Sequence, residues 1–281
     1  MANPVQTKTG SNGAAQSIAI TPTSTPTVGN YLVVALFGFG NSEPATPTFV
    51  DTGSNTYTVD ENETTTANLA TGIVTIAHTK VASAAGAPFK VTVDLNDNGG
   101  ANDAINVVVY EITGDSMTQP DNTGSLNNAA SGASISPGSV TPITAGDFTV
   151  VAFAQDAIGS TSWTSPTGYT SSLKVLSGVG NEIGEILYKD LSGTPATNPS
   201  FSSISPNNMP LAVAQAFYRP VAGSGARGLF RTGLSVAGIG SGGSFFGNPI
   251  GRAPGPVREA PRRRRRRKFV ELGVGACTPI L

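Results

Sequence analysis

The chain has 281 residues but only one cysteine, and it has no apolar run long enough to cross a membrane. The lone Cys277 excludes an intramolecular disulfide and a cysteine-based zinc site, and leaves two alternatives open, an unpaired thiol and a crosslink between subunits. The most apolar run, residues 31–39, is far shorter than a spanning helix. Residues 232–251 are uncharged, but seven of them are glycine, so no membrane span is predicted.

Arginine is absent from residues 1–218, which carry five lysines against sixteen carboxylates and therefore a net charge of −11. Residues 219–281 carry eleven arginines and one lysine against two glutamates, which gives a net charge of +10. An acidic body joined to a basic tail says little about the fold. Such an asymmetry points instead to contacts with partners.

No catalytic residue, cofactor site or metal site is predicted. His78 is the only histidine, and no motif such as G-x-S-x-G accompanies it. Glu182 and Glu185 are the pair of carboxylates that a glycosidase needs, but residues three apart in a strand point to opposite faces. Residues 94–103 partly match a calcium loop, yet Ile105 stands where the last carboxylate is required. A hairpin loop explains that segment better, and the chain is predicted not to be an enzyme.

Residues 1–218 alternate between short segments rich in β-branched and aromatic residues and clusters of Gly, Pro, Asn, Ser and Thr. No long window places apolar residues at helical spacing. The body is therefore predicted to be all-β. The segments expected to form its main strands are NYLVVALF, GIVTIAHTKV, FKVTVDL, INVVVYEI, FTVVAFA, EIGEILYKD and LAVAQAFY.

The body also repeats itself, because TPTVGNYLVVALF at 25–37 aligns with TPITAGDFTVVAFA at 141–154. The repeat predicts two halves, 5–113 and 130–218, each of six strands. Alternating apolar and polar positions favour strands with one buried face, packed sheet on sheet as an antiparallel β-sandwich. One sandwich domain over 1–219 is preferred, although the pattern leaves two abutting domains open.

Three motifs carry a family resemblance: GNYLVVALF at 29–37, DTGSNTYTVD at 51–60 and GDFTVVAFA at 146–154. In these the body resembles a widespread group of bacterial and phage β-sandwich surface domains with a jelly-roll-like fold. The match covers about residues 4–219. The resemblance implies either a surface module of secreted proteins or an accessory protein of phage particles, and it implies no catalytic residue.

The remaining residues, 220–281, are rich in Gly, Pro and Arg and are expected to form an extended arm. Within it, adjacent positive charges repel one another unless a polyanion or an acidic surface neutralises them. Nucleic-acid phosphates, an anionic membrane surface or an acidic protein surface all fit, and a solvated tail without a partner stays open. Without interleaved aromatics, nucleic-acid contact is expected to be unspecific. The predicted partner-binding residues are Arg262, Arg263, Arg264, Arg265, Arg266, Arg267 and Lys268.

The first twenty residues show no Sec signal peptide, which favours a phage structural protein over a secreted module. The expectation is a capsid-decoration, fibre or tail-associated protein located in the virion. Its acidic body is displayed, and its arm docks on a capsid or other virion protein, or on neighbouring copies in a homo-oligomer.

The alternative is a carbohydrate-binding or adhesion module of a bacterial surface or extracellular protein. Trp163 and Tyr169 would then offer an exposed aromatic face for stacking on a glycan. Packing in the core is the other role open to a single tryptophan.

Overall fold

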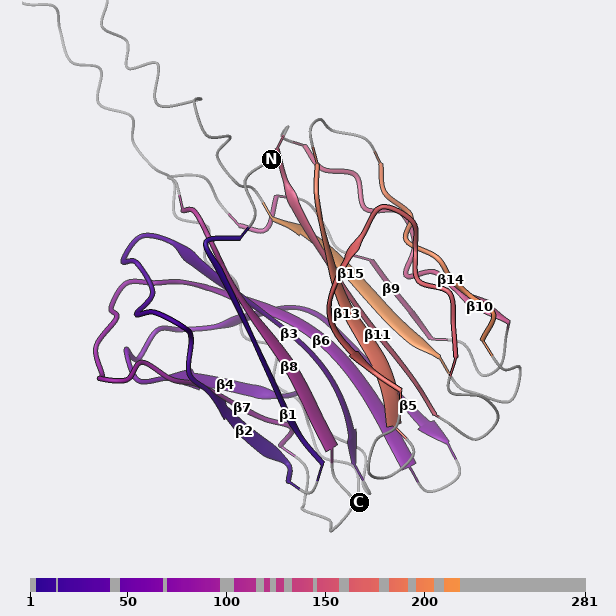
Figure 1. Ribbon diagram of the computed structural model, residues 1–281, viewed down its shortest axis with the longest axis horizontal. Coiled ribbons are helices and arrows are strands. Elements are labelled where there is room, and N and C mark those ends of the chain that lie inside the picture. Colours follow the sequence, from indigo (N-terminus) through magenta and orange to yellow (C-terminus); the bar gives the residue numbers. More distant parts are fainter. Residues whose placement is uncertain are drawn as a thin grey trace, which may run out of the picture. The chain divides into compact units, whose positions relative to one another are not determined.

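The described part of the chain consists of antiparallel β-strands and contains no helix (Figure 1), which confirms the predicted all-β class. The structure is a computed structural model. All described residues belong to one compact unit that spans residues 1–229. They are residues 4–13, 15–40, 46–67, 70–96, 104–114, 119–121, 125–128, 133–143, 146–156, 162–176, 182–191, 196–204 and 210–217.

The first eight strands form two sheets. Five of them make the first large sheet, in the order β1-β8-β3-β6-β5, and three make the first small sheet, in the order β2-β7-β4. All neighbouring strands in both sheets are antiparallel. The strands are β1 Gln6–Asn12, β2 Ser17–Ile20, β3 Tyr31–Gly40, β4 Thr48–Asp51, β5 Thr58–Ala67, β6 Ala70–Lys80, β7 Val91–Asp94 and β8 Ala104–Ile112.

The next seven strands form two more sheets. The second large sheet has the order β12-β13-β11-β15-β9, and the second small sheet pairs β10 with β14. These pairs are antiparallel as well. The strands are β9 Ser125–Asn128, β10 Ser134–Ile135, β11 Phe148–Asp156, β12 Thr170–Val175, β13 Glu182–Asp190, β14 Phe201–Ser202 and β15 Leu211–Phe217.

The two large sheets share one strand order, because β9, β15, β11, β13 and β12 take the places of β1, β8, β3, β6 and β5. In the small sheets, β10 and β14 correspond to β2 and β7. A bridge between Thr164 and Ser202 stands where β4 pairs with β7. The two copies of the repeated sequence motif lie at equivalent places in the two sheets, since β3 begins at Tyr31 and β11 begins at Phe148.

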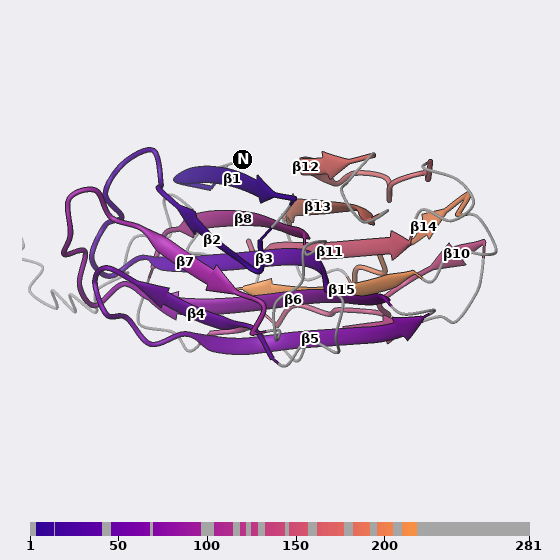
Figure 2. The same ribbon diagram turned by 90° about the horizontal axis from the view of Figure 1, so that it is seen from below.

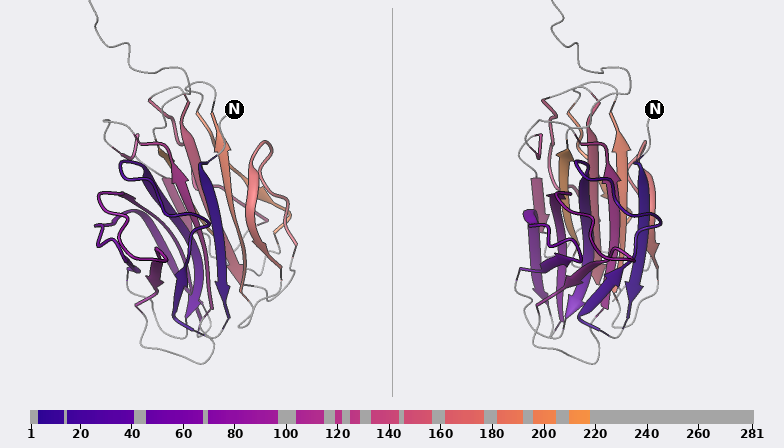
Figure 3. Two further views of the ribbon diagram at one scale, coloured as in Figure 1. Left: turned by 60° about the vertical axis from the view of Figure 1, so that its left-hand side comes forward. Right: turned by 90° about the vertical axis from the view of Figure 1, so that its left-hand side faces the viewer.

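The four sheets lie in layers (Figure 1). The order runs from the first small sheet through the two large sheets to the second small sheet. Figure 2 shows the strands of the two large sheets from a second side, and in Figure 3 their long strands run in about the same direction. No strand of one half pairs with a strand of the other half among the described residues, so the halves meet through side chains.

Three apolar cores fill the spaces between the layers. A central core lies between the two large sheets and includes Phe37, Tyr110, Phe148 and Phe217. A first outer core lies under the first small sheet and a second outer core under the second small sheet. Within the central core, the rings of Tyr110, Phe148 and Tyr188 lie 5.2–5.7 Å apart, and Tyr110 donates a 2.8 Å hydrogen bond to Ser172 across the sheets.

The central strands of both large sheets are buried on both faces. Along β3, Val33 and Ala35 face the central core while Val34 and Leu36 face the first outer core. The same alternation between two apolar cores runs through β8, β11 and β15. The prediction of one buried face per strand is therefore wrong for these strands, because a layer covers each side.

Two further expectations are corrected. The segments FKVTVDL and INVVVYEI were predicted to pair through a hairpin, but β7 lies in the first small sheet and β8 in the first large sheet. Within the described residues, the first predicted half, 5–113, also contains eight strands rather than six, whereas the second, 130–218, contains the predicted six and is preceded by β9. An additional strand such as β1 lies at a sheet edge and carries half-exposed polar residues, so it lacks the apolar pattern of a core strand.

Candidate functional site

The predicted docking residues of the basic arm, Arg262 to Arg267 with Lys268, lie outside the described residues, as does Cys277. Their roles in partner binding and in crosslinking stay predictions. The structure describes the acidic body, and the second half of that body contains both aromatic residues that were singled out for glycan stacking.

Trp163 lies in the second outer core and is only 7% exposed. Its ring lies 5.2 Å from that of Phe153, and the Lys174 ammonium group stands 4.4 Å from the ring centroid. The indole Nε1 donates a 2.7 Å hydrogen bond to Glu185. The ring is therefore packed against protein groups, and it forms no exposed platform of the kind that glycan stacking requires.

Glu185 is a buried carboxylate that serves this packing. It is 1% exposed, and it accepts hydrogen bonds from Trp163 and from the hydroxyl of Ser165. Lys174 lies 3.7 Å away as a partly exposed ionic partner. The pairing of β13 with β11 runs without a break from Glu182 to Asp190, so positions 182 and 185 fall on opposite faces, as predicted.

A second buried carboxylate, Glu111, has a similar structural environment. It accepts hydrogen bonds from the backbone N–H of Thr27 at 2.8 Å, from the Asn30 amide at 2.6 Å and from Gln6. These bonds connect β1 and the turn before β3 to β8. Because buried carboxylates need several donors, the cluster explains why an acidic residue is placed inside this edge of the sheet.

His78 lies on β6 between the two large sheets and is 8% exposed. Its Nδ1 is 2.8 Å from the Asp60 carboxylate, and its ring contacts those of Tyr31 and Phe217. Asp60 stands where the β5–β6 register shifts between Val59 and Glu61. A bulge of this kind cannot be located from the sequence pattern, so the sequence does not predict Asp60 as the partner of His78.

Burial raises the pKa of both carboxyls at this bulge. The pKa of Glu61 rises to about 7 because the group is buried and because Asp60 stands beside it. The pKa of Asp60 is also raised by burial, although the hydrogen bond and the charge of His78 act in the opposite direction. A carboxyl whose folded-state pKa is raised binds its proton more tightly in the folded protein than in the unfolded chain.

Replacement of Glu61 by glutamine is expected to stabilise the protein at pH 8. The folded-state pKa is about 7 and the ordinary value 4.5, so the contribution of Glu61 falls as pH rises between them. After allowance for solvent screening, Glu61→Gln should gain about 1–2 kcal/mol at pH 8 and almost nothing at pH 4. Urea unfolding at both pH values measures this, and Glu63→Gln removes the same charge from the same strand. An equal gain from Glu63→Gln would assign the effect to net charge instead.

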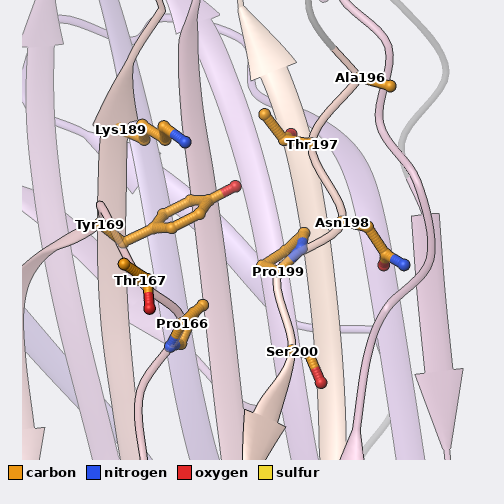
Figure 4. Close-up of a pocket in the computed structure, with 9 residues that line it drawn as sticks. All are labelled: Pro166, Thr167, Tyr169, Lys189, Ala196, Thr197, Asn198, Pro199 and Ser200. Carbon is orange, nitrogen blue, oxygen red and sulfur yellow. The ribbon is translucent and has the colours of Figure 1, made fainter.

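Tyr169 lines a pocket that opens on the surface of the second half (Figure 4). Its ring is half-buried, and Lys189 places its ammonium group 5.3 Å from the ring centroid. Burial raises the pKa of the Tyr169 hydroxyl, an effect that the neighbouring Thr197 side chain partly offsets. Unlike Trp163, Tyr169 therefore stands at a hollow that solvent reaches.

Among the described residues, no group of three or more His, Cys, Asp or Glu side chains is placed to hold a metal ion. Asn96 closes a short turn on Asp94 through a 2.8 Å hydrogen bond, while positions 97–103 of the suggested calcium loop lie outside the described residues. The described part of the chain contains no helix long and apolar enough to cross a membrane.

Comparison with known proteins finds no matching family model, no matching curated protein and no matching solved structure. The resemblance of the motifs to bacterial and phage surface domains therefore stays a prediction from the sequence.

Proposed function

We propose that this chain is a non-enzymatic structural protein of a phage particle, with its acidic body displayed and its basic C-terminal arm docked on the particle or on neighbouring copies. The observation that carries the proposal is the charge division, −11 over residues 1–218 against +10 over residues 219–281. Opposite charges held in separate parts of one chain suit a protein that binds with one part and presents the other.

We further propose that each half is a jelly-roll-like β-sandwich and that the halves are pseudo-repeats within one body of residues 1–219, followed by the arm at 220–281. The equal strand order of the two large sheets supports this. So does the placement of one small sheet against the outer face of each large sheet. On this view the central core joins two sandwiches into a single rigid body.

A rigid body suits display on a particle. The buried faces of β3, β8, β11 and β15 leave little room for one half to move against the other without exposing the central core. The arm, in contrast, has the composition of an adaptable segment that orders on binding. Its seven consecutive positive residues, 262–268, would attract phosphate groups or an acidic protein surface, and the attraction would weaken as salt rises.

Removal of the arm is expected to abolish incorporation into particles. The test compares the full chain, a 1–219 truncation, and a full-length variant with residues 262–268 changed to glutamine. The readouts are co-sedimentation with particles that lack this protein and light scattering of the protein alone, both over a salt series. We expect that only the full chain binds particles and assembles, and that rising salt reverses both, because the two variants lack the charges that attract an acidic surface.

The glutamine variant is the matched control, since it keeps the length of the arm and changes only its seven consecutive positive residues. Equal incorporation of all three proteins would show that the arm is not the docking element and would refute the proposal. Loss in the truncation alone would assign docking to the rest of the arm, 220–261 or 269–281, and would exclude the positive run 262–268 as its source.

A further inference from the structure

The second half has a surface pocket of 390 Å³ between two of its loops. One wall is the turn that leads into β12, and the other is the segment that leads into β14 (Figure 4). A volume of this size lies in the range of small-molecule sites. The lining residues are Pro166, Thr167, Tyr169, Lys189, Ala196, Thr197, Asn198, Pro199 and Ser200.

In the first half, the equivalent loops are tied together. Asn55, in the turn before β5, donates a 2.8 Å hydrogen bond to the carbonyl of Ser83, and its Oδ1 accepts from the N–H groups of Ala82 and Ser83. Phe89, just before β7, is 2% exposed and belongs to the first outer core. The hydrogen bonds of Asn55 and the buried ring of Phe89 thus close the space between these two loops of the first half.

Among the described residues of the second half, neither the side-chain bridge of Asn55 nor the buried ring of Phe89 has a counterpart at this place. Equivalent pairings align Val50 with Thr164 and Thr58 with Thr170, so the turn that contains Asn55 is two residues shorter here. The alignment also places Pro199 where Phe89 stands, two residues before the partner of Ile135. The pocket therefore lies where the second half departs from the first in turn length and in side chain, although the large sheets of both halves share one strand order.

The lining selects for an anionic, hydroxyl-rich ligand. Lys189 is the only charged residue among the nine that form the pocket, so the local charge is positive although the body is acidic. Tyr169 supplies an aromatic ring, and the side chains of Thr167, Asn198 and Ser200 supply hydroxyl and amide groups. Ser136 donates to the Asn198 Oδ1 and thereby holds that amide in one orientation. Pro166 and Pro199 form stiff walls.

We propose that this pocket binds a sugar that carries a carboxylate, such as a hexuronic acid residue of a polysaccharide. Lys189 would meet the carboxylate, Tyr169 would pack against the apolar side of the sugar ring, and the hydroxyl and amide groups would bond its hydroxyls. This inference does not rest on docking of the C-terminal arm, and it places the ligand at Tyr169 rather than at the buried Trp163.

The test is saturation-transfer NMR and calorimetric titration of the full-length protein with methyl glucuronide and methyl glucoside, which differ in the carboxylate. We expect binding of the glucuronide and roughly tenfold weaker binding of the glucoside, in line with loss of one charge-assisted hydrogen bond. Lys189→Met should weaken glucuronide binding by a similar factor, and Tyr169→Leu should weaken both sugars.

The matched control is Lys80→Met. Lys80 also lies over a tyrosine ring, 5.7 Å from the centroid of Tyr31, but in the first half and away from the pocket. The arm is present in every variant, so carboxylate binding by its arginines would survive Lys189→Met unchanged. Three results would each overturn the proposal. These are unchanged glucuronide binding by Lys189→Met, equal affinity of the unmodified protein for the two sugars, and no binding of the glucuronide by the unmodified protein.

Discussion

Replacement of Gly184 by alanine is expected to lower the free energy of unfolding by about 3 kcal/mol. Gly184 lies on β13 at the inner face of the second large sheet. A Cβ atom there would be 2.4 Å from the Phe153 carbonyl oxygen and 2.7 Å from the nearest ring carbon of Phe37, which belongs to the first large sheet. Since the first of these neighbours is backbone and the second is packed in the central core, neither can move cheaply.

Gly38→Ala provides the matched control, because Gly38 is also a glycine of a central strand. Its nearest neighbours would be 3.0–3.2 Å from the added carbon, so we expect a cost of about 1 kcal/mol. Denaturant unfolding of both variants measures the difference. In a Phe37→Leu background the cost of Gly184→Ala should shrink, because residues in contact are coupled. An unchanged stability of Gly184→Ala would contradict the close approach of the two large sheets at this point.

The sequence predicted the main strands well, and the reason is physical. Segments such as NYLVVALF and FTVVAFA combine β-branched and aromatic residues with turn-forming flanks, and both became central strands, β3 and β11. The repeat was visible for the same reason, since equivalent strands that fill equivalent cores need similar residues. The edge strand β1 is largely exposed and fills no such core, and it was not predicted.

The layering was not predictable from the pattern alone. An unbroken apolar run such as residues 31–37 fits a strand with two covered faces, but it does not say which sheets cover it. The pairing error at β7 and β8 has a similar origin, because neighbouring strands in sequence are often neighbours in a sheet and here they are not. Both outcomes depend on contacts between residues far apart in the chain.

The candidate site was recognised only in part. Tyr169 was named from its residue type, but Lys189 and the loop 196–200 come from other parts of the chain, and only the fold brings them beside it. Trp163 was named on the same grounds and lies in a core instead. Residue type therefore indicated the aromatic groups, while the surroundings that decide their roles came from tertiary structure.

Replacement of Glu185 by alanine is expected to cost about 3–4 kcal/mol, because it leaves buried donors without an acceptor. The Trp163 Nε1–H and the Ser165 hydroxyl both donate to this carboxylate. Urea unfolding measures the cost. Fluorescence reports on the site directly, since Trp163 is the only tryptophan, and its emission should shift to longer wavelength as water reaches the vacated space.

Two companion variants separate hydrogen bonding from charge at the same place. Glu185→Gln keeps an acceptor oxygen for Trp163 and should cost only about 1 kcal/mol. Lys174→Met removes the ionic partner, which is one-third exposed, and should also cost no more than about 1 kcal/mol. If either variant proves as damaging as Glu185→Ala, the ion pair rather than the hydrogen bonds maintains this core. If the expected order holds, Glu185 is an acceptor built into the packing around Trp163, which is a structural use of the carboxylate that had suggested a glycosidase.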